Sequence, residues 1–225
     1  MIGVGIFPAT TRTISTKGKI FTLPSGESSQ QPLNLIIVDW RNYNKYYTGA
    51  YDAQKPEPPA CYAIHAVIAE MKPGPQVKRP SNPDCATCTF NKFGSAMTGR
   101  GKACKNTIRL AVTAGDFTID TEPMLLNVSP TGITSWSNYM NGLIVMEKHP
   151  VMFITEITFD VNQSYPKLQF KVGVPNPDLE TAWAIRDKAQ VMLEALPNSD
   201  NDSSVRMTDP DNVEPNTQIS KAPAP

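Results

Sequence analysis

Four cysteines constrain the fold of this chain more than any other feature of its sequence. They lie at positions 61, 85, 88 and 104, so their spacing reads C-x23-C-x2-C-x15-C. Cys85 and Cys88 form a C-x-x-C pair, which allows two thiolates to reach one tetrahedral metal ion from a tight turn. Cys104 follows a glycine-containing stretch that is flexible enough to bring it back to this pair. The spacing predicts one structural zinc ion bound by these three cysteines. Cys61 is the fourth ligand, and His65, four residues further on, is the alternative.

Other uses of the thiols fit the sequence less well. Two disulfides would need an oxidising compartment, and the first residues lack the basic start of a secretory signal. A redox C-x-x-C would need a thioredoxin-like βαβ context, which the surrounding sequence does not offer. A catalytic zinc of the nucleobase-deaminase type needs an H-x-E element, but Val67 stands two residues after His65, where the glutamate is required. With only two histidines in the chain, a Ser-His-Asp triad is also disfavoured, and we predict a protein that is not an enzyme.

The zero net charge of the 225 residues hides an uneven distribution. Residues 72–109 carry eight basic side chains against Asp84 alone, which gives a net charge of +7. Residues 110–197 sum to −5, residues 198–225 to −3 and residues 1–71 to +1. Clustered lysine and arginine are typical of nucleic-acid binding, although a solvated lysine-rich loop would have the same composition. The charge distribution therefore favours a polyanion as partner without establishing one.

The alternation of apolar residues predicts a β-rich α+β domain. Strands are expected over residues 19–23, 33–40, 106–114, 117–128, 151–161 and 167–172, and helices over residues 135–147 and 178–196. Residues 61–69 fit a strand or a short helix equally well. We expect one domain over residues 1–197, with residues 61–106 as an inserted zinc loop, and a disordered acidic tail over residues 198–225. No run of 18 apolar residues occurs, so no membrane contact through a spanning helix is expected.

Residues 85–106 read CATCTFNKFGSAMTGRGKACKN and fit the pattern C-x-x-C-x-x-N-x-[FW]-G-S-x-x-x-G-x-G-K-A-C-[KR]. This loop resembles the zinc loop of a tailed-phage family of single-stranded DNA-binding proteins, and the upstream YYTGAYD and PPAC segments are similar to that family too. The resemblance covers roughly residues 33–172. It implies an OB-like five-stranded barrel with an inserted zinc loop, one or two helices and an acidic tail. It also implies sequence-nonspecific protection of single-stranded DNA during replication or recombination in the host cytoplasm. Phage replication proteins would be partners, and self-association is left open.

Binding to single-stranded DNA requires cations along a groove and aromatic faces on which bases stack. The basic candidates for phosphate contacts are Lys92, Arg100, Lys102, Lys105 and Arg109. The aromatic candidates for base stacking are Tyr43, Tyr46, Tyr47, Tyr51 and Phe93. Burial in the core is the competing explanation for each aromatic side chain.

Two further functions stay open on the sequence alone. In the first, the zinc-stabilised loop serves protein contacts in a phage structural or interaction protein. In the second, the metal serves a zinc-dependent nuclease, for which Asp84 and Glu70 are the only acids close in sequence to the cysteines. A phosphate-loop function is disfavoured because Ala103 follows Lys102 where Ser or Thr is required.

Overall fold

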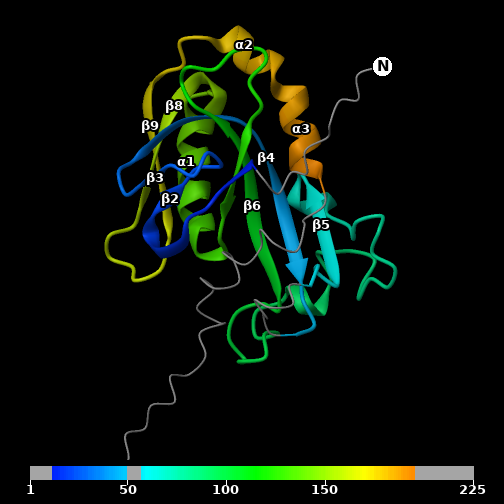
Figure 1. Cartoon of the computed structure of the whole chain (residues 1–225). Helices are drawn as coiled ribbons and strands as arrows, with labels where there is room; N and C mark the ends of the chain where they lie inside the picture. Colours follow the sequence, from blue (N-terminus) through cyan, green and yellow to red (C-terminus); the bar gives the residue numbers. More distant parts are fainter. Residues whose placement is uncertain (1–11, 50–56, 196–225) are drawn as a thin grey trace, which may run out of the picture.

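Strand β4 (Leu33–Tyr46) is the longest strand and organises the sheet in the computed structural model, which describes residues 12–49 and 57–195. Its N-terminal half pairs with β8 (Phe153–Phe159), its C-terminal half pairs with β5 (Cys61–His65), and its other edge pairs with β6 (Cys104–Thr113). All three pairings are antiparallel. Strand β4 therefore runs from the part of the sheet that contains β8 to the part that contains β5 (Figure 1).

Three further strands belong to this sheet: β1 (Thr13–Ile14), β7 (Met124–Val128) and β9 (Leu168–Pro175). The sheet has seven strands in the order β1-β7-β6-β4-β8-β9, with β5 added to the free part of β4, and it curls into a half-barrel. A separate hairpin consists of β2 (Phe21–Thr22) and β3 (Ser28–Ser29). The predicted β-rich α+β class is confirmed.

A β-bulge at Val38 changes the direction of the side chains in β4. Ile37 pairs with Val112 and Asp39 pairs with Ala111, so Val38 has no opposite residue on β6. The extra residue shifts the two-residue alternation. Leu35 and Ile37 therefore face the main core, whereas Val38 and Asp39 both face the other side of the sheet.

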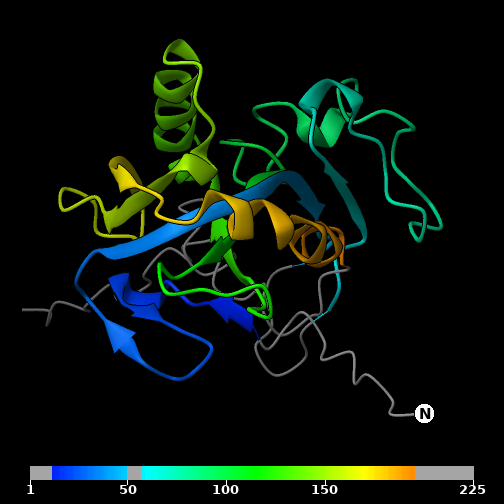
Figure 2. The same ribbon diagram turned by 90° about the horizontal axis from the view of Figure 1, so that it is seen from above.

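Helices cover both sides of β4. Helix α1 (Ile133–Val145) buries Trp136, Tyr139 and Leu143 in the main core inside the curl of the sheet. Helices α2 (Leu179–Ala184) and α3 (Arg186–Glu194) lie on the opposite side, where α3 buries apolar residues against Val38, Ala111 and Leu125. Figures 1 and 2 both place α1 and α3 on opposite sides of β4. Helix α3 therefore covers the outer face of the central strands β4 and β6.

Several predicted boundaries differ from those in the structure. The helix expected over residues 178–196 is two helices, because Ile185 has a ψ near 0° that ends α2 before α3 begins. The strand expected over residues 33–40 continues to Tyr46, and residues 61–65 of the undecided segment form β5. Only the second half of the strand expected over residues 117–128 forms, as β7. The predicted acidic tail over residues 198–225 lies outside the described residues.

Candidate metal centre and nucleic-acid interface

The four cysteines converge at the end of the sheet where β5, β4 and β6 lie side by side. Tyr46 on β4 is opposite Cys61 on β5 and opposite Cys104 on β6, so the three side chains lie on one face of the sheet. All four cysteines, Cys85 and Cys88 included, line a single cavity of about 20 Å³. That volume holds little more than one water-sized particle, which fits a single ion better than an organic cofactor.

Hydrogen bonds fix the turn that carries the C-x-x-C pair. The backbone N–H of Cys85 donates to the carbonyl of Met71 at 3.2 Å, and the side-chain amide of Asn91 donates to the carbonyl of Cys85 at 2.8 Å. The backbone N–H of Ala86 donates to the Asp84 carboxylate at 2.8 Å. The turn is therefore tied to the Met71 backbone and to the Asn91 side chain and is closed on itself by Asp84, and both of its thiols line the cavity.

Three asparagines connect this turn to the sheet and to a lysine. The side-chain amide of Asn106 donates to Asn44 on β4 and to Asn91 beside the turn, in the latter case at 3.0 Å. The ammonium group of Lys102 donates to Asn106 at 2.7 Å and to Asn91 at 3.3 Å. Lys102 is therefore positioned by the same side chains that support the cysteine turn.

The pKa values of the thiols reflect a crowded and partly buried group of sulfurs. Burial, together with the nearby thiols of Cys85, Cys61 and Cys88, raises the pKa of Cys104 to about 12. Burial and the Cys61 thiol likewise raise the pKa of Cys85 to about 11. The neighbouring thiols thus disfavour ionisation of Cys85 and Cys104, and a bound divalent cation would reverse this effect.

The donor set fits zinc in type and number, although it is not fully assembled. The four cysteines are free rather than joined in disulfides, and four sulfurs match the closed tetrahedral site that structural zinc prefers. Over residues 12–49 and 57–195, no three His, Cys, Asp or Glu side chains already have the close arrangement of a metal-bound group.

The other candidate ligands and acids lie outside the cavity. His65 is four residues along the same strand from Cys61, which corresponds to about 13 Å in a strand rather than one helical turn. Its ring lies 3.7 Å from the Glu70 carboxylate and contacts the backbone of Val67. Neither Glu70 nor Asp84 lines the cavity. The geometry therefore favours Cys61 over His65 as the fourth ligand.

The basic candidates fall into three groups. Lys92 and Arg100 are exposed on the loop that precedes β6, and Lys102 lies half-buried at its base, with its ammonium group 5.3 Å from the centre of the Phe93 ring. Lys105 is half-buried on β6. Arg109 is only 5% exposed, and its guanidinium donates to the carbonyls of Leu193 and Ala195 at the end of α3. The prediction that Arg109 contacts DNA is therefore wrong, because this side chain holds the C-terminal end of a helix.

The aromatic candidates are similarly divided. Phe93 is 84% exposed, whereas Tyr43 is 1% exposed and its ring lies 4.4 Å from the Arg109 guanidinium. The prediction that Tyr43 stacks on bases is therefore wrong, since its strand position points it toward the face that α3 covers. Tyr46 is half-buried and stacks on Phe90 with ring centres 4.3 Å apart, and Tyr47 is half-buried as well. Tyr51 lies outside the described residues.

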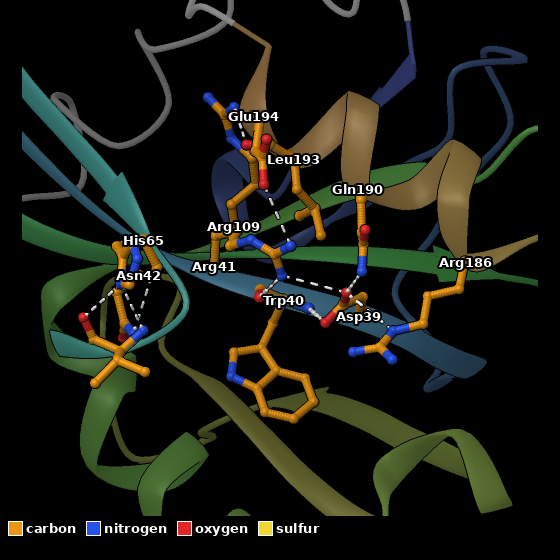
Figure 3. Close-up of polar contacts among 11 residues, drawn as sticks. Asp39, Trp40, Arg41, Asn42, His65, Arg109, Arg186, Gln190, Leu193 and Glu194 are labelled. Carbon is orange, nitrogen blue, oxygen red and sulfur yellow. Dashed lines mark hydrogen bonds and ion pairs between the residues drawn. The ribbon is translucent and has the colours of Figure 1, made fainter. Parts of the chain in front are cut away.

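A buried ionic cluster holds α3 against β4 and explains why so many polar residues lie on this face (Figure 3). The Asp39 carboxylate accepts hydrogen bonds from Arg186 at 3.2 Å and Gln190 at 3.3 Å, and it lies 3.2 Å from the Arg41 guanidinium. Arg41 also lies 3.3 Å from Glu194 at the end of the helix. Sequence reasoning missed this cluster, because its β4 members lie more than a hundred residues before its α3 members in the chain. In addition, only the bulge brings Asp39 to this face.

The fold and the site together define a β-rich α+β protein with a four-cysteine cavity beneath a basic loop. Comparisons with protein-family models, curated proteins and solved structures give no match. Within the described part of the chain, none of the helices has the length and apolar character needed to span a membrane.

Proposed function

We propose that the protein binds single-stranded DNA of a phage without sequence preference and without catalysing a reaction, and that one zinc ion stiffens the loop that makes the contact. The observation that carries this proposal is the position of the basic loop. Lys92 and Arg100 are exposed on a segment whose base holds the half-buried Lys102 and the cavity lined by all four cysteines. From Cys85 to Arg109 this segment contains no Asp or Glu, so its charge has one sign.

Zinc would be held by Cys61, Cys85, Cys88 and Cys104, and it would supply a fixed tetrahedral crosslink between β5, β6 and the C-x-x-C turn. The loop needs such a crosslink, because it buries little apolar surface of its own and few of its side chains reach the main core. The asparagine contacts of Lys102 would then transmit the rigidity of the metal site to the binding surface.

We further propose that β4, β6, β7, β8 and β9 correspond to an OB-like barrel. Three features support this assignment: β4 pairs with both β6 and β8, β6 pairs with β7, and α1 connects β7 to β8. In OB-folds the loop between the first and second strands is one of the segments that bind oligonucleotides. The cysteine loop occupies that position between β4 and β6. Because α3 covers the outer face of β4 and β6, the loop rather than the sheet face would make the main contact.

A titration of the full chain with fluorescently labelled oligo-dT over a range of salt concentrations tests the proposal, with zinc content measured on the same sample. We expect one zinc per chain and an affinity that falls steeply with salt, because phosphate contacts release counterions. The double variant Lys92→Ala/Arg100→Ala should reduce the slope of log K against log salt by about 1.4, since each lost phosphate contact on a single strand contributes about 0.7.

The matched control is Lys148→Ala/Lys171→Ala, which removes two exposed lysines outside the cysteine loop and should leave the slope unchanged. Absence of salt-sensitive binding by the wild-type protein would refute the proposal and favour a structural or interaction protein. Metal-dependent cleavage of DNA that is lost in Asp84→Ala would instead establish a nuclease.

A further inference from the structure

The segment between Phe90 and Ala103 is a loop held rigid by its own hydrogen bonds. The backbone N–H of Gly94 donates to the carbonyl of Gly101 at 2.7 Å, which closes the loop across its width. The backbone N–H of Ala103 donates to the Ser95 hydroxyl at 3.0 Å, and that hydroxyl lies within hydrogen-bonding distance of two backbone carbonyls. Gly94 and Gly101 have φ values of 85° and 67°, a left-handed conformation that glycine adopts readily. The loop therefore presents its outward side chains from a defined backbone.

Two of these outward side chains are large and apolar. Phe93 is 84% exposed and Met97 is 99% exposed, so neither contributes to any of the three core clusters. Figure 1 places this loop beyond the lower end of β4 and β6, where it projects away from the sheet. Two large, highly exposed apolar side chains four residues apart on one hydrogen-bonded loop are available to contact a partner.

The charges around this pair indicate what the partner is. Lys92 and Arg100 are exposed on the same loop, and the Lys102 ammonium group lies 5.3 Å from the Phe93 ring centre. No acidic residue occurs from Cys85 to Arg109. The partner must therefore offer negative charge beside an apolar surface that two side chains can enter, and stacked bases flanked by phosphates have this chemistry. A membrane surface would call for an extended apolar face rather than two side chains.

We infer that Phe93 and Met97 form a wedge that recognises the junction between single-stranded and double-stranded DNA, a substrate class narrower than single-stranded DNA in general. The inference rests on the proposed function. Apolar wedges of this kind enter a base step and partly unstack it, while nearby cations hold the flanking phosphates. At a junction the last base pair is stacked on one side only, so the wedge opens it at the lowest cost. Lys92 and Arg100 hold the phosphates on either side of the opened step.

The experiment compares two DNA probes of equal tail length, a labelled oligo-dT single strand and a duplex with the same oligo-dT tail. The duplex carries 2-aminopurine in its terminal base pair, whose fluorescence increases when the base is unstacked. We expect the full chain to bind the tailed duplex roughly ten-fold more tightly than the single strand, which corresponds to one additional base contact, and to increase the 2-aminopurine fluorescence. The double variant Phe93→Ser/Met97→Ser should lose both effects.

Because both side chains are exposed, the double variant should fold like the wild-type protein, as its unfolding temperature will confirm. Val161→Ser is the matched control, since it removes another apolar side chain that is 86% exposed but lies in the β8–β9 turn. Equal affinity for the two probes, with salt-sensitive binding to oligo-dT intact, would refute the wedge and leave the proposed function standing. Loss of the duplex preference in Val161→Ser as well would also refute it. Binding of the loop to anionic vesicles instead of either DNA would overturn both proposals.

Discussion

Replacement of Asp39 by alanine tests whether the buried ionic cluster holds α3 on the sheet. The side chain of Asp39 is 4% exposed and that of Arg41 is 10% exposed, so the variant would leave the Arg41 guanidinium buried without its closest anion. The carboxylate also accepts hydrogen bonds from Arg186, Gln190 and the backbone N–H of Trp40. All three would lose this acceptor. We therefore expect Asp39→Ala to destabilise the protein and to loosen α3.

The expected magnitude follows from the exposure of each partner. Removal of one member of a buried ion pair costs about 3–5 kcal/mol. Arg41 keeps its contacts with the Glu194 carboxylate at 3.3 Å and the Trp40 carbonyl at 2.9 Å, which places the cost near the lower end. The side chain of Arg186 is 38% exposed and can be hydrated, so its contact adds less than about 1 kcal/mol. The free energy of unfolding should fall by about 3 kcal/mol.

Urea unfolding followed by circular dichroism measures this change, with wild type and variant compared at equal slope. Glu156→Ala is the control, because Glu156 forms an exposed ion pair with Lys171 at 3.6 Å that should contribute at most about 0.5 kcal/mol. A loss in Asp39→Ala below about 1 kcal/mol, or equal to that of the control, would refute the argument that the cluster anchors α3.

The contribution of Asp39 should also depend on pH. Burial alone would raise the pKa of Asp39, but the Trp40 N–H and the charges of Arg41 and Arg186 outweigh burial and lower the pKa below its ordinary value of 3.8. The ionised carboxylate therefore stabilises the folded state fully above the unfolded pKa, and this stabilisation is lost as the pH falls through the lower folded pKa. The difference between wild type and Asp39→Ala should be constant near neutral pH and should shrink below about pH 4. A difference that grows in acid would contradict this assignment.

Two further predictions concern the metal and the tail. Cys61→Ser should reduce the zinc content from one ion per chain and lower the unfolding temperature. His65→Ala should retain the zinc, because of these two residues only Cys61 lines the cavity. The opposite pattern in metal analysis would make His65 the ligand. Deletion of residues 198–225, which carry a net charge of −3, should tighten oligo-dT binding at low salt by removing a competitor for the basic loop; unchanged affinity in a fluorescence titration would contradict that role.

Local patterns in the sequence were sufficient to predict the elements that have one buried face. Residues 135–147 repeat apolar side chains at helical spacing, and α1 (Ile133–Val145) buries Trp136, Tyr139 and Leu143 accordingly. Residues 35–38 are apolar on both faces, and the structure buries both faces of this part of β4. The spacing of the cysteines predicted a shared site from local structure as well. A tight turn holds Cys85 and Cys88, and the glycine-containing stretch before Cys104 is flexible enough to bring it back to them.

Positions fixed by long-range contacts were not predictable in this way. Tyr43 and Arg109 have the composition of a DNA-binding surface, but α3 covers their face of the sheet. Only the bulge at Val38 determines which alternate residues of β4 face α3, and no local signal marks a bulge in a run of apolar residues. Met97 was not predicted as a contact residue, because a single methionine in a glycine-rich loop carries no periodic pattern. Its exposure follows from hydrogen bonds across the loop.

The fold divides the basic residues of the segment 72–109 into those that stabilise the protein and those that are free to bind a polyanion. Arg109 donates to the end of α3, Lys102 donates to Asn91 and Asn106, and Lys105 is half-buried on β6. The remaining five basic side chains are exposed: Lys72, Lys78, Arg79, Lys92 and Arg100. If each neutralises one phosphate, the slope of log K against log salt on oligo-dT should be no steeper than about −3.5 per chain. Two further contacts from the half-buried Lys102 and Lys105 would instead give about −4.9. A slope near that larger value would mean that these two lysines also bind phosphates, whereas a slope near −3.5 would mean that the five exposed side chains make the contacts.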